Sequence, residues 1–234
     1  MAVNIDTVYQ RVLAFANKEQ RGYITPQEFN LFADQAQNEI FDQYFYDLNQ
    51  LSRVNRSSEE YANMTEYLKE KIDIFKRKSS AALGDNASKG ISSYAYQIGT
   101  VWNEEGFVIE EVEREKLQNL YRSRLLRPSV NKPVYIRRGT IMYVHPTSDY
   151  VNKTIYYEYI KQPDKPNWTY VVVHQKPMFD PNNSSYADFE LHHSEENELV
   201  YKILGYAGIT LKKPDVIQSS NSLEIAKVQQ EKQA

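Results

Sequence analysis

The chain has no cysteine, and this absence excludes several kinds of site at once. Without thiols there is no disulfide, no thiolate nucleophile and no cysteine-ligated zinc or iron–sulfur centre. Glycine is also scarce, and the eight glycines form neither a P-loop nor G-x-G-x-x-G. Nor does a G-x-S-x-G motif place a nucleophile beside one of the four histidines. We therefore expect a protein that is not an enzyme and binds no cofactor, although catalytic carboxylates, which leave no spacing signature, remain an alternative.

Long apolar runs and a strong charge of either sign are missing as well. No run approaches 18 apolar residues and the first ten residues lack the pattern of a signal peptide, so we expect no contact with a membrane. The net charge of −3 and the pI near 5.9 argue against a dedicated duplex-binding protein, which would carry a basic footprint. What the chain does have is tyrosine, with 19 Tyr against 9 Phe and 2 Trp. Tyrosine is favoured both at partner surfaces and along strands, and the composition leaves both uses open.

Residues 17–29, with the sequence NKEQRGYITPQEF, resemble a calcium-binding loop at first sight. Glycine stands at loop position 6 and Glu28 at position 12, as such a loop requires. Arg21 at position 5, however, would bring a permanent cation with no acceptor atom into the site. The same letters predict a glycine turn at Gly22 followed by a T-x-x-E capping box from Thr25 to Glu28, with Pro26 as the first helical residue. We expect this turn, and keep a degenerate calcium-binding or other interaction module as the alternative.

A second possible metal site lies at His192 and His193, among several glutamates. On an extended strand, adjacent side chains point to opposite faces, so the two rings would not converge on one ion. We therefore expect no metal at this position.

Hydrophobic periodicity predicts the organisation of the chain. Three helices, near residues 6–17, 26–51 and 58–78, each carry one apolar face, and the basic residues 76–78 complete the third. Residues 133–146 read as a β-hairpin, 91–102, 154–160 and 168–173 as extended segments, and 110–126 as a charged helix. Ser194 is expected to cap a further helix that Gly205 and Gly208 stop.

These elements predict an α+β fold, mainly a helical bundle with a small antiparallel β insertion and an extended C-terminal tail. The expected parts are an N-terminal helical bundle (1–80), a linker (81–90), a mixed segment with the antiparallel β insertion (91–188), a helix that packs on the bundle (189–211) and an extended tail (212–234). The tail is polar and broken by proline, and its few apolar residues cannot build a core. We expect it either to fray or to become ordered on a partner.

Two charge blocks stand out. Basic residues without any acid occupy 121–138: Arg122, Arg124, Arg127, Lys132, Arg137 and Arg138. Acidic residues without Lys or Arg occupy 180–201: Asp180, Asp188, Glu190, Glu195, Glu196 and Glu198. The blocks could face each other or be two solvated faces. Between copies, they would instead form a heterologous head-to-tail contact, which closes into a ring if the rotation permits. Nucleic-acid binding by the basic block, with stacking on Tyr135 and Tyr143, is a weaker alternative.

Five segments in their order along the chain suggest a family: RGYITPQEFN, EVEREKLQNLYRSRLLRP, PVYIRRGTIMYVHP, KQPDKPNWTY and FELHHSEENELVYKILGYAGITLKKPDVIQ. Over about residues 11–230 the chain resembles virion structural proteins of short-tailed phages, in particular the crAss-like phages. The β segment from 132 to 173 is larger than in minimal helical adaptors of this kind.

The resemblance implies a ring or adaptor subunit of the head-to-tail connector, at the head-tail junction or tail of a virion assembled in the host cytoplasm. The implied partners are further copies in a homo-oligomeric ring, with twelve as the usual connector symmetry, the portal or other connector and tail rings, and double-stranded DNA that passes through without sequence recognition. The expected partner-binding residues are Arg122, Arg124, Arg127, Arg137 and Arg138, Glu190, Glu195, Glu196 and Glu198, and, on the tail, Leu223, Ile225 and Val228.

Overall fold

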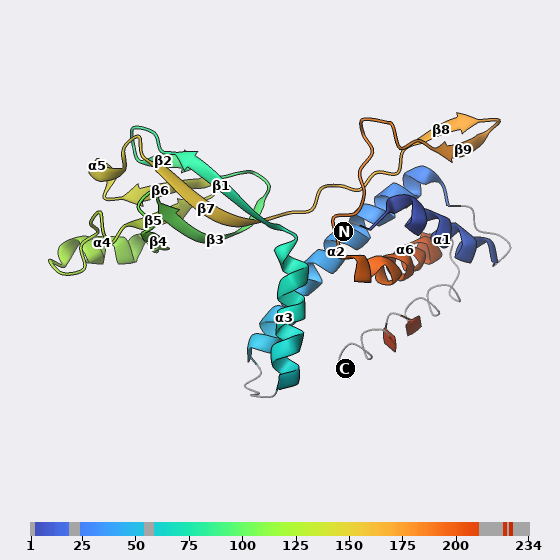
Figure 1. Ribbon diagram of the computed structural model, residues 1–234, viewed down its shortest axis with the longest axis horizontal. Helices are drawn as coiled ribbons and strands as arrows, with labels where there is room; N and C mark the ends of the chain where they lie inside the picture. Colours follow the sequence, from blue (N-terminus) through green and yellow to red (C-terminus); the bar gives the residue numbers. More distant parts are fainter. Residues whose placement is uncertain (1–2, 19–23, 54–58, 211–221, 224, 227–234) are drawn as a thin grey trace. The chain divides into compact units, whose positions relative to one another are not determined.

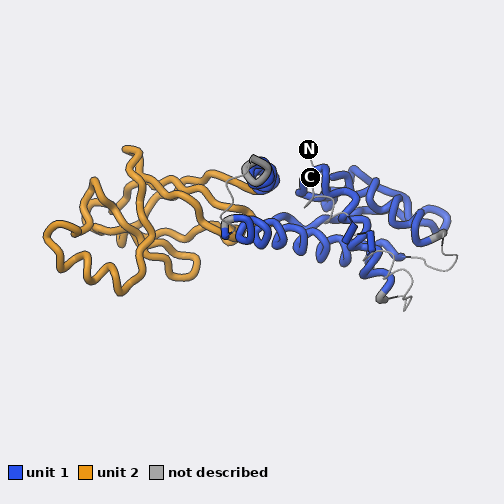
Figure 2. Tube along the Cα trace, turned by 90° about the horizontal axis from the view of Figure 1, so that it is seen from below, with its two compact units in different colours: residues 1–74, 163–234 blue, residues 75–162 orange. Residues whose placement is uncertain are grey.

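A computed structural model describes residues 3–18, 24–53, 59–210, 222–223 and 225–226. The chain forms two compact units, shown in separate colours in Figure 2. Unit 1 comprises residues 1–74 and 163–234, and unit 2 comprises residues 75–162, so unit 2 is inserted into the sequence of unit 1. The predicted turn residues Arg21 and Gly22 and most of the predicted tail lie outside the described residues.

Unit 1 is built on helices (Figure 1). They are α1 (Ile5–Lys18), α2 (Pro26–Arg53), α3 (Glu59–Asp73), the short 3₁₀ helix η1 (His193–Glu195) and α6 (Glu196–Thr210). Helix α6 contacts both α1 and α2, and α3 contacts α2. The buried side chains repeat at three- and four-residue steps and form the core, among them Val8, Val12, Phe29, Ala33, Ala36, Ile40, Leu199, Ile203 and Ala207.

The start of α2 confirms the predicted capping box. The backbone N–H of Thr25 donates to Glu28 Oε2 over 2.9 Å, its hydroxyl donates to the same oxygen over 2.7 Å, and the N–H of Glu28 donates back to the Thr25 hydroxyl over 3.3 Å. Pro26 is the first helical residue, as expected. The hydrogen bond from the Thr25 backbone, followed by that from its hydroxyl, lowers the pKa of the Glu28 carboxyl. The carboxylate that would have completed a calcium loop is therefore bound to Thr25.

Polar side chains of α2 hold an extended segment that begins at Pro163. Asn30 donates to the carbonyl of Trp168 and accepts from its N–H, and Gln37 likewise donates to the carbonyl of Asp164 and accepts from the N–H of Glu190. The fully buried Trp168 anchors this segment, and its indole N–H donates to Asp6 over 2.9 Å. The segment carries a two-stranded hairpin of β8 (Tyr170–Val173) and β9 (Lys176–Phe179).

Unit 2 is a seven-stranded sheet in the order β1-β7-β3-β4-β5-β6-β2. The strands are β1 (Lys76–Ala82), β2 (Ser88–Gly90), β3 (Ala95–Asn103), β4 (Val108–Glu111), β5 (Val134–Arg138), β6 (Ile141–His145) and β7 (Thr154–Lys161), with the helices α4 (Arg114–Arg122) and α5 (Thr147–Tyr150). Strands β4 and β5 pair in parallel, whereas the other pairs are antiparallel. The core is made of buried side chains, including Leu83, Val101, Ile109, Met142, Val144, Tyr150 and Ile155.

The predicted fold class is therefore wrong. The chain is about 43% helical and 28% strand, and its sheet is mixed and nearly closed like a barrel, so the β part is not a small antiparallel insertion in a helical bundle. Strands β1, β2 and β4 are short or polar and carry little hydrophobic alternation. Their pairing depends on partners far away in the sequence, which a local pattern does not reveal.

The observed boundaries of several elements differ from the predicted ones, again because pairing and packing with distant residues decide them. The third helix ends at Asp73, and residues 76–78, expected at its basic end, begin β1 and pair with β7. The expected linker 81–90 contains the end of β1 and all of β2. The first two residues of the expected helix 110–126 belong to β4, and only α4 is helical in that range. Helix α6 runs through Gly205 and Gly208 to Thr210, because its packing on α1 and α2 outweighs the roughly 1 kcal/mol that each interior glycine costs.

The hairpin of β5 and β6 confirms the expectation for residues 133–146, with Gly139 in the left-handed region at φ +59°. Among the described helices, none is long and apolar enough to cross a membrane.

Candidate functional site: an arginine groove on unit 2

The predicted basic residues are all part of unit 2, and their five arginines are exposed. Arg122 ends α4, Arg124 and Arg127 follow it, and Arg137 and Arg138 end β5. Helix α4 packs on β5 through Leu117, which forms a small cluster with Val134 and Ile136. This packing fixes the first turn of α4 beside the arginines at the end of β5.

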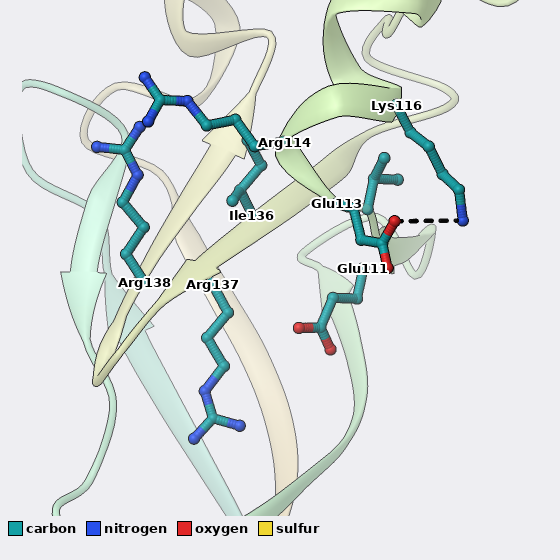
Figure 3. A pocket seen from close by; sticks show the side chains of 8 residues that line it. Glu111, Glu113, Arg114, Lys116, Ile136, Arg137 and Arg138 are labelled. Carbon is teal, nitrogen blue, oxygen red and sulfur yellow. Dashed lines mark ion pairs between the residues drawn. The ribbon is translucent and has the colours of Figure 1, made fainter.

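An open groove of about 760 Å³ lies between the first turn of α4, the end of β4 and the end of β5. Its lining consists of Glu111, Val112, Glu113, Arg114, Lys116, Ile136, Arg137 and Arg138. In Figure 3 the guanidinium groups of Arg114 and Arg138 point toward one another, whereas Glu111 and Glu113 lie at the other side of the groove. Four cations and two carboxylates thus share one groove.

Both carboxylates of the groove already have partners. The hydroxyl of Tyr135 donates to Glu111 Oε2 over 3.1 Å, and burial, followed by the charge of Glu111, raises the pKa of that tyrosine. Glu113 lies 3.7 Å from Lys116 Nζ in an exposed pair. Arg137 donates to the carbonyl of Gly139, and Arg138 lies over the ring of Tyr143 at 5.2 Å.

Within the described part of the chain, no carboxylate forms an ion pair with Arg114, Arg137 or Arg138. A guanidinium presents a rigid fork of donors that matches the oxygens of a carboxylate or phosphate. The groove can therefore bind an oxyanion.

The loop after α4 is a second feature of this surface. Leu125 is 90% exposed and Leu126 62% exposed, between Arg124 and Arg127. Arg127 lies over the ring of Tyr121 at 5.8 Å. The sequence pattern singled out the arginines here but not the leucines or Arg114, which lie within residues 110–126, expected to form one charged helix.

The acidic block does not form one surface. Glu195 and Glu198 are 1% and 6% exposed, and Glu195 pairs with the buried Lys71 at 2.5 Å. Glu196 pairs with Arg11 at 3.1 Å, and Glu190 accepts from the N–H of Asp164. Glu196 and Glu198 lie in the first turn of α6, where the positive end of the helix dipole favours carboxylates. Glu190, Glu195 and Glu196 have partners within unit 1.

The opposite charge is a property of the two whole units and not only of the two blocks. Unit 2 has 14 Lys and Arg against 9 Asp and Glu, a net charge of +5. Unit 1 has the other 14 basic residues against 22 acidic ones, a net charge of −8. The total of −3 hides this polarity, and a count over the true units is the signal that reveals it.

The remaining predicted residues lie elsewhere. On the tail, Leu223 and Ile225 are exposed, and Val228 lies outside the described residues. His192 and His193 do not point apart, since their ring centroids lie 4.1 Å from each other and His192 caps η1 by accepting from the N–H of Ser194. The prediction that the two rings point apart was wrong because it assumed a strand, whereas η1 begins at His193. The described residues include no group of three or more metal-binding side chains.

Comparisons with models of known protein families and with curated proteins found no match.

Proposed function

We propose that the protein is a non-enzymatic ring or adaptor subunit of the head-to-tail connector of a short-tailed phage. The observation that carries the proposal is the opposite net charge of its two units, +5 and −8. An acidic surface of one copy attracts a basic surface of another, and such a contact between different surfaces is heterologous. Repeated head to tail, it closes into a ring when the rotation between copies divides a full turn.

The arginine groove and the exposed leucines support assembly as the role of unit 2. Arginines without an ion-pair partner in the described chain, next to large exposed apolar side chains, are typical of a protein interface. In the proposed connector, this surface holds neighbouring copies together, and the portal or tail rings lie above and below. Double-stranded DNA passes through the ring without sequence recognition.

The test is the size of the purified protein against ionic strength, measured by sedimentation velocity. Because salt screens exposed charges, the account predicts a large particle at low salt that dissociates as salt is added. The double variant Arg137→Glu/Arg138→Glu should weaken assembly at every salt concentration. Lys78→Glu/Lys89→Glu is the matched control, since it makes the same change of charge elsewhere on unit 2 and should keep more of the assembly.

A particle whose size changes neither with salt nor with the arginine variant would refute assembly through charge. Equal loss in both double variants would show that the net charge of unit 2 matters but that the contact lies away from Arg137 and Arg138.

A further inference from the structure

We propose that the arginine groove of one copy binds Glu66 and Glu70 on helix α3 of another copy. The inference rests on the proposed function, because it specifies the contact that would join neighbouring copies.

The groove presents two cations to one place. The guanidinium groups of Arg114 and Arg138 point toward one another in Figure 3, and neither forms an ion pair within the described residues. Two like charges held together repel, and an anion between them relieves the repulsion. A partner with two carboxylates can give each guanidinium its own acceptor.

Helix α3 offers such a pair. Glu66 and Glu70 are exposed and stand one turn apart, so their side chains leave the same face of the helix with Cβ atoms about 6 Å apart. Neither has a hydrogen bond or an ion pair within the described residues. Like charges at this spacing disfavour the helix slightly. Both sides of the proposed contact therefore have unsatisfied charge of opposite sign.

Several other acids of unit 1 already have partners. Glu39 pairs with Lys202 at 3.4 Å and accepts from the hydroxyl of Tyr206, Asp34 pairs with Lys165 at 3.6 Å, and Glu196 pairs with Arg11. A groove that recruited these carboxylates would have to break contacts within the neighbouring copy.

The two carboxylates of the groove favour a protein partner over a nucleic acid. Glu111 and Glu113 would repel a phosphate backbone that runs along the groove. Helix α3 instead has the exposed Lys69 between its two glutamates. A helix face with two acids and one base matches a groove in which cations outnumber carboxylates.

The test uses the absence of cysteine from the chain. Full-length Arg138→Cys and Glu70→Cys proteins are mixed at low salt and treated with a short bismaleimide, because an arginine–glutamate contact holds the Cβ atoms farther apart than a disulfide spans. We expect a crosslinked dimer that contains one chain of each variant. Replacing Arg138→Cys by Thr100→Cys, an exposed position elsewhere on unit 2, should abolish that product.

A charge exchange gives a second readout. Arg114→Glu/Arg138→Glu should raise the protein concentration needed for assembly at least tenfold. Mixing this variant with Glu66→Arg/Glu70→Arg chains should restore a contact between the two. Circular dichroism of each variant checks that it is folded.

The outcomes separate the two proposals. If the wild-type chain assembles but neither the specific crosslink nor the rescue by charge exchange is observed, the α3 contact is overturned and the proposal of a ring still stands. Absence of any assembly would overturn both. A third possible result is that a labelled oligonucleotide binds the wild-type chain but not Arg114→Glu/Arg138→Glu, while the cysteine variants give no crosslinked dimer. That result would identify the groove as a nucleic-acid site and overturn the proposal.

Discussion

At the scale of single residues, the most informative contact is the reciprocal pair of Thr25 and Glu28. Two oxygen atoms satisfy three donors, among them two backbone N–H groups at the start of α2. The sequence predicts this contact because the T-x-x-E capping box involves only residues within one helical turn. The contact fixes where the longest helix of unit 1 begins.

The substitution Thr25→Ala should destabilise the chain by about 1 kcal/mol, the usual cost of removing a capping hydroxyl. Because the folded pKa of Glu28 lies below its ordinary value of 4.5, the carboxylate contributes stability above that pH. The contribution is lost as the pH falls through the lowered pKa. Urea unfolding at neutral and acidic pH measures both effects.

Glu28→Gln is the matched control for the pH dependence. The amide oxygen can still accept from Thr25, but it does not titrate, so the fall in stability with acid should be smaller than in the wild-type chain. An identical pH dependence in Glu28→Gln would contradict the role assigned to this carboxyl.

At the scale of elements, the buried pair of Lys71 and Glu195 joins α3 to η1, which directly precedes α6. The two side chains are 4% and 1% exposed, and the ammonium also lies 4.5 Å from the ring centre of Tyr67. A buried charge that loses its partner keeps the cost of desolvation without the compensating attraction. This pair should therefore dominate the stability of the contact between α3 and η1.

Lys71→Met should destabilise the protein by about 3–5 kcal/mol. The double variant Lys71→Met/Glu195→Leu should recover a large part of that loss, because no buried charge then lacks a partner. A double-mutant cycle in urea gives the coupling energy. Additive losses would show that the two side chains do not depend on each other.

Some helices and strands could be predicted from the sequence and others could not. The helices α1, α2 and α6 and the hairpin of β5 and β6 were predictable, since apolar periodicity and turn residues are local signals. Strand β1 was not predictable, because its polar residues continue a helical pattern and become extended only by pairing with β7. The same holds for β4, which pairs in parallel with a strand more than 20 residues away.

The candidate site was predictable in part for a similar reason. The arginines of β5 stand out as a charge run, but Arg114 is brought beside them only by the packing of Leu117 on that strand. The acidic block failed as a surface because two of its glutamates are buried. Burial of a charged side chain depends on a partner such as Lys71, which a charge count does not identify.

At the scale of the whole molecule, the chain is one unit inserted into another. The N–H of Lys161 donates to the carbonyl of Phe75 over 2.9 Å, so the two ends of unit 2 lie side by side. Unit 2 also has a core of its own. Adjacent ends and a separate core are the conditions under which an inserted domain folds independently.

Residues 75–162 expressed alone should therefore give a folded protein rich in β structure, with one cooperative thermal transition. Circular dichroism and thermal unfolding measure this. The matched deletion, in which a short Gly-Ser linker replaces the same residues, should keep the helical signal of unit 1. A disordered 75–162 fragment would contradict the division into two units.

Electron microscopy of the purified full-length protein at low salt shows directly whether oppositely charged units join copies into a ring. We expect closed rings with a central opening, which disappear from the images as salt is raised. Single unassociated particles at every salt concentration would contradict this expectation.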